Sequence, residues 1–283
     1  MSPKSDTCPT CDDLNNKILA TKDNEEKYQE YEVEKELHLR KAEKGQKNIQ
    51  MQTVQAKNDS KYHVITFDLQ QALPTPKIST RPAFYKRKLW TYNLGTHNCG
   101  IGVGHSYVWN EIGEKRIRGN SKLLEKSILM TFMETLLVAI SDNCCGENKN
   151  WNMIFFCLWV ISGRFKRIEQ FPVPGDTMLP NDRDFAIVER YVRWQVQCVY
   201  SPDEWICVLQ LSAKSNPFKV VQIQQSDFIS TTELNLFLQR NTVNKNKESI
   251  QLRNCASMVF QESEPFTVTF YEHTAGEIQC AQK

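Results

Sequence analysis

Four acidic residues have the types and spacing that suit metal-dependent chemistry. Asp68 lies in the middle of one short apolar run, and Asp142 directly follows another. Asp182 and Glu189 are seven residues apart in the sequence, so one face of a helix would carry both. Clustered carboxylates repel one another, and a divalent cation offsets that repulsion. The pattern therefore predicts a carboxylate site that binds Mg²⁺ or Mn²⁺ through oxygen ligands.

Two such ions can activate a water molecule or a 3′-hydroxyl group and stabilise the leaving oxygen of a phosphodiester. We expect Asp68 to bridge both ions, Asp142 to hold one, and Asp182 or Glu189 to hold the other. In the alternative interpretation, Asp142 caps one helix, Asp182 and Asp184 cap another, and Glu189 is solvated, because carboxylates favour first helical turns. A carboxylate in an apolar strand is costly to bury without a partner. For Asp68 this favours the metal interpretation.

The elements that position these acids follow from apolar periodicity and turn residues. Strands are expected at 63–69 and 136–141 and at 168–173, with a hairpin of 88–94 and 105–111 around a glycine-rich turn. Helices are expected at 120–135, 150–165 and 182–196. This order predicts an α/β fold in which helices flank a mixed sheet over residues 61–200.

The flanking regions have a different composition. Residues 15–60 are polar and charged, which predicts one extended helix with few contacts to the core and a role in self-association. From this segment alone, a coiled-coil interaction protein is a further interpretation. Residues 201–283 are expected to form an accessory region that ends in a small β-rich tail, with strands near 219–223 and 266–271.

Residues 1–14 contain Cys8 and Cys11 in a C-x-x-C motif. Two thiolates are half of a tetrahedral zinc site, which needs four ligands. His38 is the only histidine nearby in the sequence, and it lies far along the predicted single helix. Two interpretations stay open, namely zinc binding and an N-terminal remnant without a metal.

Composition limits the class of protein. The chain has 283 residues, 40% hydrophobic and 24% charged, with a formal net charge of +2, so nucleic-acid binding would need a local basic surface. We expect DNA contacts from Asn148, Lys149, Arg164, Lys166 and Arg167. No apolar leader or membrane-length run is present, so the ten cysteines are expected to be reduced thiols in an intracellular protein, nuclear if it acts on DNA.

Several long strings carry a resemblance. They are FDLQQALPTPKISTRPAFYKRKLWTYNLGTHNC (67–99), SDNCCGENKN (141–150), FPVPGDTMLPNDRDFAIVE (171–189), SAKSNPF (212–218), TCPTCDDL (7–14) and HLRKAEK (38–44). Together they resemble a large family of transposon-derived proteins with a ribonuclease H-like domain of the transposase and integrase type. The resemblance implies a magnesium-dependent nuclease or polynucleotidyl-transferase acting on DNA. It matches Asp68, Asp142 and either Asp182 or Glu189 to the acidic positions of the family.

Two departures from the family pattern add negative charge beside the expected site. Glu147 stands within GEN where the pattern has GQN, and Asp176 replaces the histidine of PGH. These changes favour the alternative that the chain is a catalytically inactive, domesticated module that binds DNA or protein.

Overall fold

The computed structural model describes residues 8–78, 87–111, 135–142, 148–161, 165–173, 179–224, 227, 243, 247–272 and 277–281. Residues 120–134 of one expected helix lie outside this part, and so does Arg164, which was expected to contact DNA.

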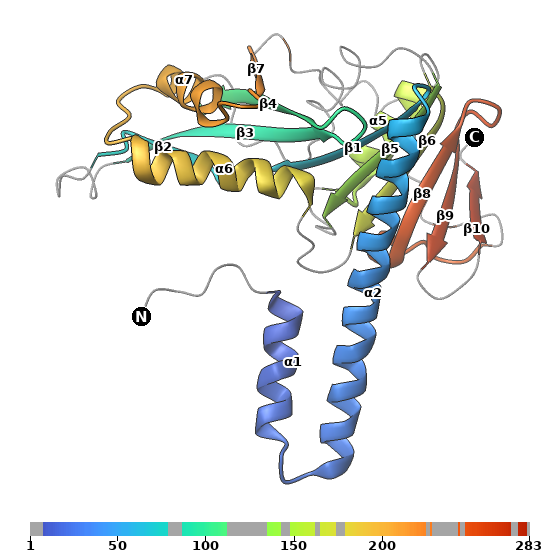
Figure 1. Cartoon of the computed structure of the whole chain (residues 1–283). Coiled ribbons are helices and arrows are strands. Elements are labelled where there is room, and N and C mark those ends of the chain that lie inside the picture. The colour runs from blue at the N-terminus through green and yellow to red at the C-terminus, as the bar shows by residue number, and fades with distance from the viewer. Residues whose placement is uncertain are drawn as a thin grey trace.

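Five strands form the centre of one sheet (Figure 1). Strand β1 (Tyr62–Leu69) pairs in parallel with β5 (Thr135–Asp142) and antiparallel with β3 (Leu89–Asn98). Strand β4 (Val103–Asn110) is antiparallel to β3, and β6 (Phe165–Val173) is parallel to β5. The order β4-β3-β1-β5-β6 confirms the predicted α/β class with a mixed sheet. The expected hairpin is confirmed as well.

The sheet continues beyond both ends of this centre. Strand β7 (Lys219–Gln222) is parallel to β4, and β2 (Leu73–Thr75) pairs with β3. At the other edge, a 3₁₀ turn η2 (Leu252–Asn254) leads into β8 (Cys255–Gln261), which pairs with β6. Strands β9 (Thr267–Glu272) and β10 (Glu277–Ala281) follow, giving ten strands in the described sheet.

The strands expected near 219–223 and 266–271 are present as β7 and β9, and both belong to the central sheet. Strands β8 and β9 extend the central sheet, and their side chains Met258, Phe260 and Phe270 are buried in the same apolar cluster as Phe67 of β1. An edge strand offers unpaired backbone groups, and β6 satisfies them by pairing with β8.

Helices cover both faces of the sheet. The apolar helix α5 (Trp151–Ile161) buries most of its side chains against one face. On the opposite face, α6 (Pro180–Gln195) packs against β3 and β1, and α7 (Pro202–Ser212) packs against α6 and β4. The C-terminal part of α2 also lies on this second face, where Ile49 is buried.

The N-terminal region is a helical hairpin, which corrects the expectation of one extended helix. Helix α1 (Pro9–Ala20) and helix α2 (Glu25–Asn58) pack side by side, and the hairpin projects from the sheet (Figure 1). The side chain of Asn24 caps α2 by accepting a hydrogen bond of 3.2 Å from the backbone N–H of Lys27. Leu14 and Ile18 of α1 are buried. In the described residues, no helix has the length and hydropathy needed to cross a membrane.

Candidate acidic site and candidate metal centre

Asp68 and Asp142 occupy corresponding positions on neighbouring parallel strands, each two residues beyond the last pair of the β1–β5 ladder. The register runs from Tyr62 opposite Leu136 to Thr66 opposite Ile140, and the same offset at the ends of both strands places Asp68 beside Asp142. Both residues are half-buried. The sequence placed one acid within its strand and the other just after its strand, whereas both belong to their strands.

Alternation along the strands puts both carboxylates on the face covered by α6. Val64, two alternations before Asp68, packs with Val138 and Ile140 and with Leu179, the residue before α6. Across the sheet, Asp68 pairs with Gly95 of β3. The ring of Phe185 on α6 lies so close above Gly95 that a Cβ atom there would be 2.4 Å from it. Helix α6 thus passes directly beside the Asp68 position.

The two predicted acids of α6 have different surroundings. Asp182 accepts a hydrogen bond of 2.6 Å from the backbone N–H of Leu179 and one of 3.2 Å from the side chain of Asn181. It therefore caps its own helix, as the alternative interpretation holds. Glu189 is exposed. Because Asp184 on the opposite side of α6 lies against Gly104 of β4, helical periodicity turns the side chains of Asp182 and Glu189 away from β4.

Asn148, which follows β5 in the chain, contacts Asp142. The Asn148 side-chain amide donates to a carboxylate oxygen of Asp142 and, over 3.4 Å, to its backbone carbonyl. Gln170 of β6 donates to the Asn148 carbonyl over 3.0 Å. Asn148 and Gln170 are fully buried. Asn148 therefore positions Asp142, and its contact with DNA stays a prediction.

The other residues expected to contact DNA are placed as follows. Lys149 is 4% exposed, and its Nζ donates to the Arg253 carbonyl over 3.1 Å. Lys166 is exposed on β6. Arg167 forms a 3.6 Å ion pair with Glu169, with both side chains partly exposed. Lys166 is therefore the most accessible of these cations.

A histidine–aspartate pair that the sequence pattern does not predict joins α6 to the sheet. His97 Nδ1 lies 2.7 Å from an Asp184 carboxylate oxygen, with both side chains at least four-fifths buried. His97 is opposite Thr66 on β1, so the pair lies two residues from Asp68. The only sequence signal was a histidine within an apolar strand.

The acidic face offers oxygen ligands, but the four predicted acids do not form a preformed cluster. The buried oxygens Thr66 Oγ1 and Asn181 Oδ1 have no hydrogen-bond partner among the described residues. This oxygen-rich donor set suits Mg²⁺. In the described chain, however, three ligand atoms lie within 4.8 Å of one another at Cys8, Cys11 and His38, and not at the predicted acids.

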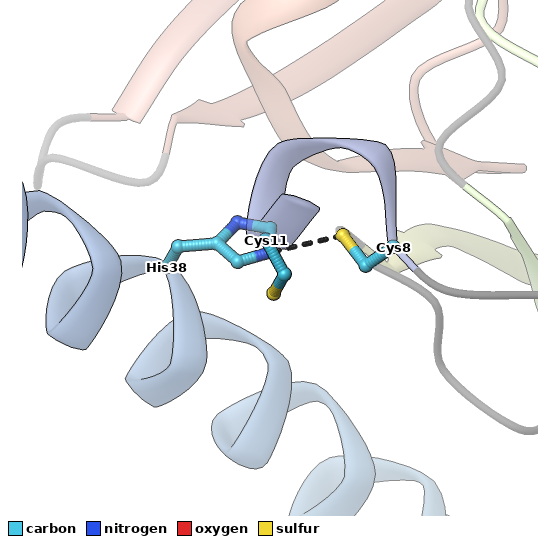
Figure 2. Close-up of side chains that lie close together, drawn as sticks. All are labelled: Cys8, Cys11 and His38. Atoms are coloured by element: carbon cyan, nitrogen blue, oxygen red, sulfur yellow. Dashed lines mark hydrogen bonds between the residues drawn. The ribbon is translucent and has the colours of Figure 1, made fainter. Parts of the chain in front are cut away.

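The Cys8, Cys11 and His38 side chains, called here the Cys/His centre, could hold a metal ion. Figure 2 shows the two thiols at the start of α1 and the imidazole of α2 pointing toward one another. Cys8 Sγ lies 3.2 Å from His38 Nε2. The hairpin turn produces this contact, because Asp23 lies midway between Cys8 and His38 in the sequence. A single straight helix, as the sequence predicts, would place His38 far from both cysteines.

The two thiols influence each other. Burial raises the pKa of Cys11 above its ordinary value, and the hydrogen bond and negative charge of Cys8 raise it further, while Lys35 lowers it. Two neighbouring thiolates are therefore unfavourable without a cation, and a bound metal ion would stabilise both.

Comparisons of the chain with protein-family models, curated proteins and solved structures found no match.

Proposed function

We propose that this chain is a transposon-derived protein with a ribonuclease H-like core, related in action to transposases and nucleases that transfer or cleave DNA phosphodiesters. The observation that carries the proposal is the corresponding positions of Asp68 and Asp142 on neighbouring central strands. A shared register puts two carboxylates on the same face of a rigid sheet, where they can act on one ligand.

The strand order supports the ribonuclease H-like assignment. Counting only the five central strands in chain order, β1, β3, β4, β5 and β6, the sheet has the order 3-2-1-4-5, with the second strand antiparallel to the first. Helix α6 then crosses the face that carries both acids. This is the arrangement that the family resemblance implies.

Magnesium is the cofactor that we propose for the acidic face. Asp68 and Asp142 would hold the ion, with Glu189 on the adjacent side of α6 as the third acid. A magnesium ion there would polarise a phosphodiester and lower the pKa of a bound water molecule. Asn148 keeps the Asp142 carboxylate in place through its side-chain amide. Lys166 offers an exposed positive charge for the DNA backbone.

The competing proposal is a catalytically inactive module that binds DNA or protein. It is favoured by the α6 acids, because Asp182 caps the helix and Asp184 pairs with His97. A carboxylate engaged in this way has fewer oxygens left for a metal ion. The two proposals share the fold and differ in whether the chain cuts DNA.

Zinc is the ion that we propose for the Cys/His centre. Thiolate sulfur and imidazole nitrogen are the ligands that Zn²⁺ prefers, with a water molecule or outside group in the fourth position. In a tetrahedral zinc site, sulfur and nitrogen ligands are about 3.6 Å apart. The separation of Cys8 Sγ and His38 Nε2 is 3.2 Å, so a small adjustment of side chains would suffice.

A plasmid-nicking assay tests the nuclease proposal. The wild-type chain should convert supercoiled DNA to open circles in Mg²⁺ or Mn²⁺ and lose this activity in EDTA. Asp142→Asn should reduce the rate at least about a hundredfold, because it removes a ligand charge while keeping the shape. Asp203→Asn, at an exposed position of α7, is the matched control, and this variant should cut normally. Absence of metal-dependent nicking by the wild type would favour the inactive module.

A further inference from the structure

Helix α1 has little apolar contact to hold it against α2. It contains 12 residues, a length at which an isolated helix is marginal in water. Of its side chains, Leu14 and Ile18 are buried, while Leu19 is 60% exposed. The salt bridge between Lys17 and Asp13 lies within α1, so it does not attach α1 to α2. Across the two helices, Lys17 Nζ lies 5.7 Å from the centre of the Tyr31 ring of α2, a contact that is weak at an exposed site. Apolar packing and this contact together provide only a weak attachment.

The Cys/His centre lies at the end of the hairpin opposite the turn. The chain links α1 to α2 through residues 21–24, and the other end of α1 carries Cys8 and Cys11 beside His38 of α2. Figure 2 shows that the ligands come from both helices. A metal ion there would connect the helices directly, whereas a disulfide between Cys8 and Cys11 would leave His38 outside the link.

We infer that Zn²⁺ bound by Cys8, Cys11 and His38 fastens α1 to α2, so that the folded hairpin is a metal-dependent element. The inference rests on the zinc assignment proposed above. With the metal bound, both ends of α1 are fixed and Leu14 and Ile18 stay covered. Loss of the metal frees the N-terminal end of α1 and uncovers these side chains, together with the half-buried tyrosines Tyr28 and Tyr31 of α2.

The test uses the reduced full-length chain and has two readouts. Cobalt(II) is the spectroscopic probe, and it should produce a sulfur-to-metal charge-transfer band and tetrahedral ligand-field bands with one ion per chain. Cys11→Ser and His38→Asn should weaken or abolish these bands. Cys207→Ser, which changes an exposed cysteine on α7, is the matched control and should leave them unchanged.

Limited trypsin digestion reads the state of the hairpin. Zinc should slow cleavage after Lys17, within α1, at least about tenfold relative to the metal-free chain, because cleavage follows the population of the open form. Cleavage after exposed Lys214 is the internal reference for protease activity. Zinc should give no protection in His38→Asn.

The outcomes separate the two claims. Cobalt bands together with zinc-dependent protection support the inference. Bands without any change in cleavage would overturn the inference and leave the zinc assignment standing. Absence of bands in the reduced chain would overturn both, and so would protection that arises only on oxidation. Nicking by the acidic site is measured separately and does not depend on any of these results.

Discussion

Helices α5 and α1 have nearly the same length, 11 and 12 residues, but their packing is very different. Helix α5 buries eight side chains against the sheet, whereas the buried side chains of α1 are Leu14 and Ile18. The comparison shows two ways to position functional groups. The sheet holds its carboxylates by strand register and a large apolar core, while the hairpin depends on a few contacts and, in our proposal, a metal ion.

The largest expected loss of stability comes from a substitution in the apolar core. Phe155→Ala on α5 should destabilise global unfolding by about 3–5 kcal/mol, because it removes a fully buried aromatic ring and leaves a cavity. Chemical denaturation measures the change. Trp159→Ala on the same helix is the matched control, because this ring is 42% exposed, and it should have a much smaller effect. Equal effects would contradict the burial of α5.

A smaller loss of stability is expected for a substitution beside the acidic site. Gly95→Ala places a Cβ atom 2.4 Å from the ring of Phe185, so the ring or α6 must move, at a cost of about 1–3 kcal/mol. Phe185→Ala in the same chain should remove the clash. The double variant should lose less stability than the sum of the losses in the two single variants. If the losses simply add, α6 does not lie against β3 as described.

A substitution in the α1–α2 hairpin should destabilise the hairpin without affecting the sheet. Leu14→Ala should accelerate trypsin cleavage after Lys17 about tenfold in the metal-free chain, because it removes one of two buried contacts. The melting temperature of the part of the chain that forms the sheet and its packed helices should stay unchanged. Leu19→Ala, at a position 60% exposed, is the matched control. If Leu14→Ala also lowered the melting temperature of the sheet region, the hairpin and the sheet would unfold together.

The smallest effect concerns Glu169 on β6. Burial raises the pKa of this carboxyl, and the guanidinium of Arg167 partly offsets the rise. A raised folded-state pKa means that the stability contribution is present at low pH and is lost as the pH rises through that pKa. Glu169→Gln should therefore match the wild type near about pH 4 and exceed it slightly at about pH 7, by well under 1 kcal/mol. Urea unfolding at both pH values measures this.

Most of the central sheet was predictable from local sequence patterns. Apolar runs located β1, β5 and β6, and the glycines at 100–104 located the turn between β3 and β4, where Gly102 has a φ of 68°. The corresponding positions of Asp68 and Asp142 were expected from their places relative to two neighbouring strands. These features depend on contacts between elements that have strong individual patterns.

The rest depended on contacts between distant segments. Nothing local indicates that β8 would pair with β6, because that edge is satisfied only in the assembled sheet. The position of His38 follows from the turn at 21–24, where Asn24 caps α2. A polar segment with few apolar positions does not distinguish one long helix from a hairpin, so the Cys/His centre was missed.

The central claim is that Asp68 and Asp142 bind a divalent ion, and thermal melting with and without Mg²⁺ tests it most directly. Millimolar Mg²⁺ should raise the melting temperature of the wild type by about 2–4 °C, because an ion that binds only the folded state stabilises it. Asp142→Asn should lack this shift, whereas Asp203→Asn should keep it. Melting curves of the wild type that are identical with and without Mg²⁺ would contradict the claim.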